Sequence, residues 1–168
     1  MSEVTLELKS TDSSNPDYVE IGTGGASQTT LKLKNFNKDG RVLMGNGLVE
    51  GTGIKGEETL SSTITSSSNS YTYGVVPQDL TGVKVVITTP DHNEYIVNMK
   101  DVVATTVSET NIKNPYTANG NGKYIIDRWY PGFKYTYTFI LKKKGIDIKV
   151  TILDWETVTA GDDNVQIQ

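Results

Sequence analysis

The only histidine of the chain, His92, is the residue on which a serine-type triad or a histidine-based metal site would have to depend. It lies in the segment PDHN, which is typical of a tight turn, and no nucleophile motif or orienting carboxylate motif accompanies it. We therefore interpret His92 as a turn residue. The substitution His92→Ala is expected to change no ligand affinity and no activity.

Two loop-like segments contain groups that bind ligands in other proteins. GTGIKG, residues 51–56, matches the dinucleotide pattern G-x-G-x-x-G, but that pattern needs a strand before it and a helix after it. The Ser/Thr-rich segment EETLSSTITSSS follows instead. GDDN, residues 161–164, offers carboxylates to calcium but lacks the spaced ligands and the final Glu of a calcium loop. Both segments are interpreted as surface loops.

Three aromatic residues, Tyr116, Trp129 and Tyr130, could stack on a sugar ring. Aromatic residues that flank a regular hairpin are more often packing residues, so we favour a structural role for them. The sequence therefore predicts no catalytic, cofactor-binding or metal-binding residue, no cofactor and no enzymatic activity.

Composition narrows the classes of partner. The chain has 168 residues, a net charge of −4 and no cysteine, which excludes disulfides and thiolate metal sites and argues against nucleic acid as a partner. No apolar run approaches the roughly 20 residues of a membrane helix. The first ten residues, MSEVTLELKS, alternate like a strand and do not form a signal peptide, which leaves open a cytoplasmic protein or a chain without its export segment.

Residues 127–155 are the most regular part of the sequence and predict two long antiparallel strands. A four-residue loop from Lys142 to Gly145 places all the large apolar residues on one face. A three-residue loop would place Asp147 and Lys149 on that face, so this register is disfavoured. We expect Lys142 to Lys144 to be exposed. The residues expected to be buried are Tyr135, Tyr137, Phe139, Ile148, Val150 and Trp155.

Shorter alternating segments predict further strands at residues 4–8, 29–36, 70–76, 83–89 and 94–99. PDHN, residues 90–93, predicts the turn of a second hairpin, and NKDG, residues 37–40, suggests that RVLM returns along TTLKLKNF. Residues 18–21 form a short strand at best, and residues 45–70 are the least regular. No stretch shows a helical period, so we predict an all-β fold, an antiparallel β-sandwich in a single domain that spans residues 1–168.

Several segments, taken in order, resemble the C-terminal domain of the Bacteroidetes fimbrillin-like family. The resemblance is carried by VPQ (Val76 to Gln78), by the W-x-P-G-x-x-Y-x-Y pattern of RWYPGFKYTY, and by a closing strand that ends at Trp155. VTLELKS and TTLKLKNF resemble the first two strands of that domain. The matching residues of the long pattern are Trp129, Pro131, Gly132, Tyr135 and Tyr137.

This resemblance implies a transthyretin-like β-sandwich in a structural or adhesive subunit of a surface fimbria or pilus. It also implies a cell-surface or outer-membrane location, export as a lipoprotein, and association with other fimbrial subunits by strand addition. Because no lipobox Cys and no first domain are present, we expect an excised C-terminal domain that is monomeric on its own. Host or bacterial surface ligands are further expected partners.

The alternatives are a carbohydrate-binding module with Trp129 or Tyr130 as its platform, and an accessory domain of a surface enzyme. For assembly, two terminal segments alternate: Val4 to Leu8, and the tail DNVQIQ with Val165 and Ile167 on one face. Donor strands need several side-chain anchors, and the tail offers only two. We therefore expect the tail to pair within its own domain, so that deletion of residues 164–168 destabilises it.

Overall fold

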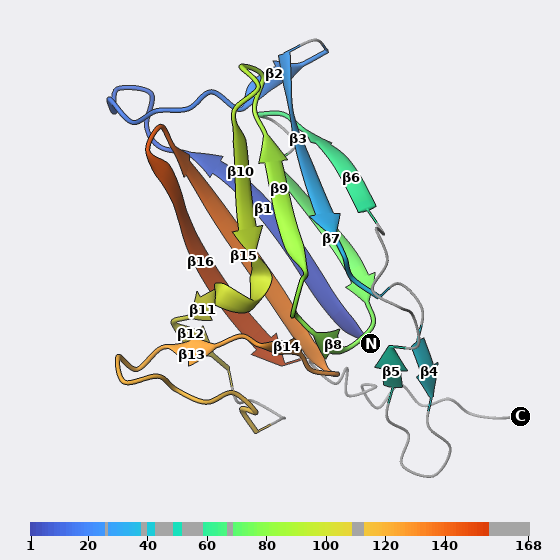
Figure 1. Cartoon of the computed structure of the whole chain (residues 1–168). Coiled ribbons are helices and arrows are strands. Elements are labelled where there is room, and N and C mark those ends of the chain that lie inside the picture. Colours follow the sequence, from blue (N-terminus) through green and yellow to red (C-terminus); the bar gives the residue numbers. More distant parts are fainter. Residues whose placement is uncertain are drawn as a thin grey trace, which may run out of the picture.

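Two β-sheets pack face to face in the computed structural model (Figure 1). The structure describes residues 1–25, 27–37, 40–42, 49–51, 59–66, 69–108 and 113–154. Within these ranges the only helix is a 3-10 turn, η1 (Met99–Asp101). The all-β sandwich is therefore confirmed, whereas the transthyretin-like connectivity stays an expectation. Trp155, residues 161–164 and the tail lie outside the described residues.

The first sheet contains the hairpin predicted from residues 127–155. Its strands, in spatial order, are β12 (Thr106–Val107), β16 (Gly145–Asp154), β15 (Phe133–Lys142), β1 (Ser2–Ser10) and β7 (Ser70–Val75). The predicted register is confirmed, because Leu141 pairs with Ile146 and Tyr137 pairs with Val150. Gly145 has a φ of +152°, an angle that residues with a side chain rarely adopt.

Two pairings in this sheet are parallel, which differs from the purely antiparallel sandwich that the sequence suggests. β1 runs parallel to β15, with Val4 beside Tyr135 and Leu8 beside Phe139, and antiparallel to β7 on its other side. β12 runs parallel to β16. The N-terminal strand is thus an interior strand of the sheet. Displacing it would break two hydrogen-bonded ladders, so it is not the easily released segment that its terminal position suggests.

The second sheet is built around β3 (Ser27–Lys34). Its strands are β10 (Glu94–Asn98), β9 (Lys84–Thr88) and β3, with β2 (Gly22–Gly24) and β6 (Thr59–Ile64) both along the far side of β3. The β9–β10 hairpin is confirmed, and Pro90 occupies the second position of a turn closed by the bond from the His92 N–H to the Thr89 carbonyl, 2.9 Å. Residues 18–21, considered a short strand at best, belong to no strand, and β2 begins directly after them at Gly22.

The predicted return of RVLM along β3 is wrong. β3 pairs with β6 and β9, whereas residues 40–42 form β4 (Gly40–Val42), which pairs with β5 (Val49–Gly51). β6 begins more than 20 residues after the end of β3, and its Ser/Thr-rich sequence alternates only weakly between apolar and polar residues. Two further ladders close the end of the sandwich where the N-terminus lies: β11 (Val103–Ala104) with β13 (Tyr124–Ile125), and β8 (Gln78–Asp79) with β14 (Arg128–Trp129).

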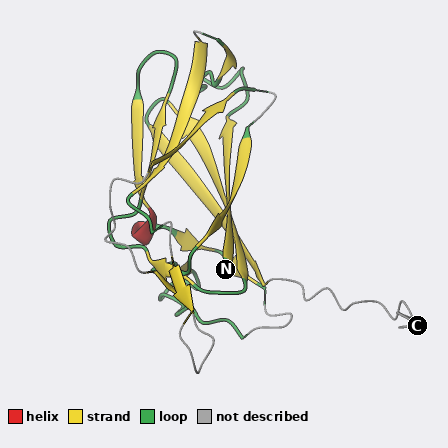
Figure 2. Cartoon of the chain, turned by 90° about the vertical axis from the view of Figure 1, so that its right-hand side faces the viewer, coloured by secondary structure: helices red, strands yellow, loops and turns green. Residues whose placement is uncertain are grey.

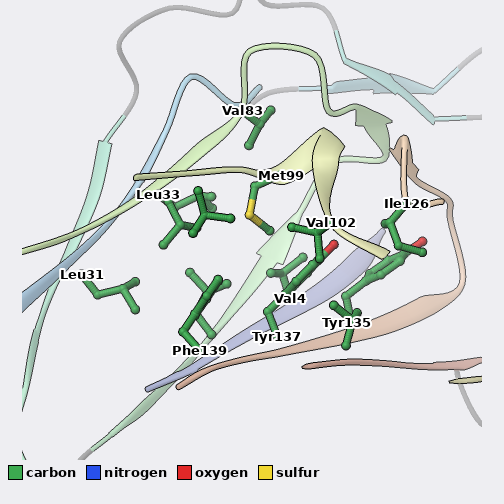
Figure 3. Packing of buried hydrophobic residues seen from close by; sticks show 14 of the residues in the cluster. Val4, Leu31, Leu33, Val83, Met99, Val102, Ile126, Tyr135, Tyr137 and Phe139 are labelled. Carbon is green, nitrogen blue, oxygen red and sulfur yellow. The ribbon is translucent and has the colours of Figure 1, made fainter. Parts of the chain in front are cut away.

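The hydrophobic core fills the space between the two sheets. Leu31 and Leu33 of β3 face Tyr137 and Phe139 of β15, and Met99 of η1 enters from the end of the sandwich (Figure 3). All of these side chains are fully or almost fully buried. Figure 2 shows η1 at the same end of the molecule as the N-terminus. Alternating apolar residues on facing strands therefore account for the two-layer fold.

A tyrosine bridges the two sheets at each side of the sandwich. Tyr71 of β7 donates a hydrogen bond of 2.6 Å to the Thr63 carbonyl of β6. Tyr95 of β10 donates one of 3.1 Å to the Lys142 carbonyl at the end of β15. Each ring covers the edge of the core while its hydroxyl reaches the main chain of the opposite sheet.

The burial expected for the hairpin is confirmed in most positions. Tyr135, Tyr137, Phe139 and Val150 are buried, and Lys143 and Lys144 are exposed. Ile148 is only partly buried, because this part of β16 is the outer strand of its sheet. Lys142 is half-buried rather than exposed, and its ammonium pairs with the Asp147 carboxylate across the turn.

Candidate functional site

Two of the sequence motifs meet in space at the end of the sandwich. β8 and β14 form a short antiparallel ladder in which Gln78 pairs with Trp129. The Gln78 side chain is buried, and its amide pairs with both main-chain groups of Asn37, as a neighbouring strand would. Its Oε1 accepts from the Asn37 N–H at 2.7 Å, and its Nε2 donates to the Asn37 carbonyl at 3.1 Å. The same Nε2 also donates to the Val76 carbonyl, at 2.9 Å. The VPQ motif is therefore a structural fastening between three chain segments.

The aromatic motif forms a buried cluster beside this ladder. Trp129 is fully buried, and its indole N–H donates to the Tyr137 hydroxyl at 3.0 Å. The Tyr130 N–H donates to the Tyr135 hydroxyl at 2.7 Å, and the hydroxyls of Tyr135 and Tyr116 lie 2.5 Å apart. The Tyr116 hydroxyl donates to the Arg128 carbonyl, at 2.8 Å. Either hydroxyl can donate in the tyrosine pair, because each also has a main-chain acceptor: the Arg128 carbonyl for Tyr116 and the Tyr130 carbonyl, at 3.4 Å, for Tyr135.

These tyrosines stay neutral under physiological conditions. Burial raises the pKa of Tyr116, Tyr135 and Tyr137, with the neighbouring tyrosines adding to the effect on Tyr116. A phenol whose pKa lies above its ordinary value of about 10 is no general base near neutral pH. The cluster therefore holds the loops to the core and supplies no general base.

The N-terminal end of β1 is fixed by the same motif. The Ser2 hydroxyl donates to the Tyr130 carbonyl at 2.7 Å, and the Gly132 N–H donates to the Met1 carbonyl at 3.1 Å. Gly132 has a φ of +81°, in the left-handed region that favours glycine. This explains why glycine follows Pro131 in the motif: the turn must reverse tightly to reach both β1 and the start of β15.

The structure places the sequence candidates for sugar stacking in different environments. Trp129 is fully buried and Tyr116 is nearly so, which confirms their packing role, and neither ring can serve as a platform. Tyr130 is half-buried, with its ring 5.2 Å from that of Tyr116 in an edge-to-face contact. The glycine-rich segment 51–56 lies outside the described residues apart from Gly51, and GDDN lies outside them entirely.

His92 lies exposed in the β9–β10 turn. Over the described ranges, no group of three or more His, Asp or Glu side chains is arranged to hold a metal ion. The described part of the chain also contains no helix with the length and apolar character needed to cross a membrane.

His92 carries a φ of +64°, which residues other than glycine adopt at a cost of roughly 1–2 kcal/mol. We expect His92→Gly to raise the free energy of unfolding by about 0.5 kcal/mol, because relief of this cost exceeds the added chain entropy of the unfolded state. Urea denaturation of the two proteins measures the difference. His92→Ala keeps the unfavourable angle and serves as the control, so equal stabilities of the glycine and alanine variants would contradict this explanation.

The comparisons with known proteins agree with this architecture. The model of the fimbrillin-like family matches residues 1–155. No curated protein sequence matches the chain.

Three solved structures share the fold. A candidate cell adhesion protein from Bacteroides uniformis is 13% identical with a TM-score of 0.52, over 92% of this chain and 50% of the other. One from Bacteroides ovatus is 16% identical with a TM-score of 0.51, over 91% of this chain and 44% of the other. The tip fimbrial protein Mfa3 from Porphyromonas gingivalis, with a C-terminal truncation, is 15% identical with a TM-score of 0.52, over 92% of this chain and 51% of the other.

The chain spans about half the length of these structures, and at such low identity the likeness is one of fold. The family match says more than the fold likeness, because the matched residues include the VPQ ladder, the aromatic cluster and both sheets. By this match over residues 1–155, the chain belongs to the fimbrillin-like family.

Proposed function

We propose that this chain is a structural or adhesive subunit of a bacterial surface fimbria and has no catalytic activity. The observation that carries the proposal is the fimbrillin-like match over residues 1–155, which includes both sheets of the sandwich. The fold likeness to the tip fimbrial protein Mfa3 supports it. The VPQ and aromatic motifs hold loops and strands to the core, which suits a module that must persist outside the cell.

The proposal includes a location and a domain organisation. Residues 1–168 act as one β-sandwich domain at the cell surface, in a fimbrium or at the outer membrane, within a protein exported as a lipoprotein. Isolated, this domain is a monomer. The fimbrillin-like match and the fold likeness to the Mfa3 protein support these statements.

Association with other subunits by strand addition needs a sheet edge with no strand beside it, and among the described strands β10 supplies one. Just beyond the two ends of the β9–β10 pair, the Asn93 carbonyl accepts from the Thr89 N–H and the Met99 N–H donates to the Val83 carbonyl. Main-chain groups alternate in direction along a strand, so those of Glu94, Ile96 and Asn98 point away from β9. Ile96 is 57% exposed in the middle of this edge. An added strand would satisfy the main-chain groups and cover the isoleucine.

Site-specific photo-crosslinking tests this assembly mode. A benzoylphenylalanine replaces Ile96 in the full-length protein, produced in cells that make the fimbria, and Ile140 is the matched control. Ile140 lies on β15, which is paired on both sides. We expect adducts with fimbrial subunits from position 96 and few from position 140. Equal adducts at both positions, or none at 96, would exclude strand addition at β10.

A further inference from the structure

An open hollow lies at the end of the sandwich opposite the aromatic cluster. Three turns that are remote in sequence meet there: the loop after β1, the β9–β10 turn and the β15–β16 turn (Figure 1). The Lys143 N–H donates to the Asp17 carbonyl at 3.1 Å, which ties two of these turns together. The hollow has a volume of about 400 Å³, within the range of small-molecule sites. Loops held by a rigid sandwich are common places for recognition.

The walls of the hollow combine rings with charged and polar groups. Tyr18, Tyr95 and Pro90 supply ring surfaces. The Tyr95 ring is anchored through its hydroxyl to the Lys142 carbonyl, so its orientation is fixed before any ligand binds. The remaining polar lining side chains are Glu20, Asp91, Asn93, Glu94 and Lys143.

Asp91 is held in place by its neighbours. One carboxylate oxygen accepts from the Thr89 hydroxyl at 2.5 Å, and the other accepts from the Asn93 amide at 2.7 Å. The Thr89 hydrogen bond holds the pKa of the Asp91 carboxyl below its ordinary value, so this acceptor is ionised at neutral pH. Each oxygen keeps lone pairs that can accept further hydrogen bonds.

A second, smaller hollow of about 190 Å³ adjoins the first. Both are lined by Tyr18 and Glu20, so these two residues lie between them, and Ser10, Thr23 and Ser66 add hydroxyl groups to the second. Two adjoining hollows can hold more than one sugar residue.

We propose that this end of the domain, the hollow lined by Tyr18, Tyr95, Asp91 and Lys143, is a binding site for a glycan that carries no acidic groups. A sugar hydroxyl both donates and accepts, which matches a wall with carboxylate acceptors beside an ammonium and an amide donor. The apolar face of a sugar ring stacks on tyrosine. Three carboxylates against one ammonium give the first hollow a net negative charge that repels uronic acids and sulfated sugars. The hollow shares Glu94 with the β10 edge, but sugar binding to the isolated chain does not require subunit assembly.

Titrations followed by 15N–1H NMR on the intact chain test the proposal. The probes are galactose, glucose, glucosamine and glucuronic acid at millimolar concentrations, together with free lysine as an amine without a sugar ring. We expect saturable shifts at residues of the three turns with at least one neutral or amino sugar, and at least tenfold weaker binding of glucuronic acid. Binding of glucosamine and lysine alike with no shift from glucose or galactose would show a simple cation site, and no saturable shift with any sugar would also overturn the proposal.

Variants link binding to the hollow. Tyr18→Ala and Lys143→Ala are each expected to weaken sugar binding at least fivefold. The matched control is Lys144→Ala, because Lys144 occupies the same turn but does not line the hollow. His92→Gly, beside the hollow but outside its lining, is a second control. Unchanged affinity in both test variants, with their NMR spectra otherwise native, would contradict the site. Failure of the titrations would leave the crosslinking at β10 unaffected, so the two proposals fail separately.

Discussion

Replacement of Phe139 by alanine is expected to lower the free energy of unfolding by about 3–5 kcal/mol. Phe139 is fully buried on β15, between Leu8 of β1 and Ile148 of β16, and its ring stacks near that of Tyr137 with centroids 6.4 Å apart. Truncation removes the transfer free energy of the ring and leaves a cavity that the two paired neighbouring strands cannot close. Urea denaturation monitored by circular dichroism measures the loss.

The control for this prediction is Ile140→Ala. Ile140 is the next residue on the same strand, but its side chain lies on the outer face of the sheet and is only partly buried. A much smaller loss is expected there. A denaturation midpoint that Phe139→Ala leaves unchanged would show that β15 does not face the core with its aromatic side.

Replacement of Gln78 by methionine is expected to lower the free energy of unfolding by about 2–4 kcal/mol, although methionine fits a similar volume. The substitution leaves the buried N–H and carbonyl of Asn37 without the partners that Gln78 provides, and each unpaired buried group costs about 1–3 kcal/mol. Thermal and urea unfolding measure the effect.

Gln28→Met is the matched control, because Gln28 is exposed on β3. We expect its stability to stay within about 0.5 kcal/mol of the parent. If the two variants were equally stable, Gln78 would not be a fastening, and the structural explanation of the VPQ motif would be wrong.

The predictability of the fold from sequence depended on how local each pairing is. The β15–β16 hairpin follows from alternation, because a slip by one residue would bring Asp147 and Lys149 to the core face. The β9–β10 hairpin follows from Pro90 in its turn. The parallel pairing of β1 with β15 joins residues more than 120 positions apart, and nothing in the alternation of Val4, Leu6 and Leu8 selects a partner or a direction.

β6 illustrates the opposite difficulty. Its residues TLSSTI carry little apolar pattern, yet they pair with β3 from Thr29 to Lys34, in place of the nearer segment RVLM. A polar outer strand is selected by main-chain hydrogen bonds and by a few anchors such as the buried Ile64, not by alternation.

The candidate sites were harder to predict from the sequence than the fold. Resemblance singled out Gln78 and Trp129 as members of a motif, but their roles required the β8–β14 ladder and the Asn37 contact. The hollow opposite the aromatic cluster has no sequence signature, because Tyr18, Asp91 and Lys143 come from three turns that only the folded sandwich brings together.

The central claim is that this chain is part of a surface fimbria, and immunogold electron microscopy of intact cells tests it most directly. The antibody is raised against the purified domain, and a strain that lacks the gene is the control. We expect gold particles along filaments that extend from the cell surface, at their shafts or at their tips, and none on the control strain. Label confined to the cell interior, or filaments that carry no label while the protein is abundant, would contradict the account.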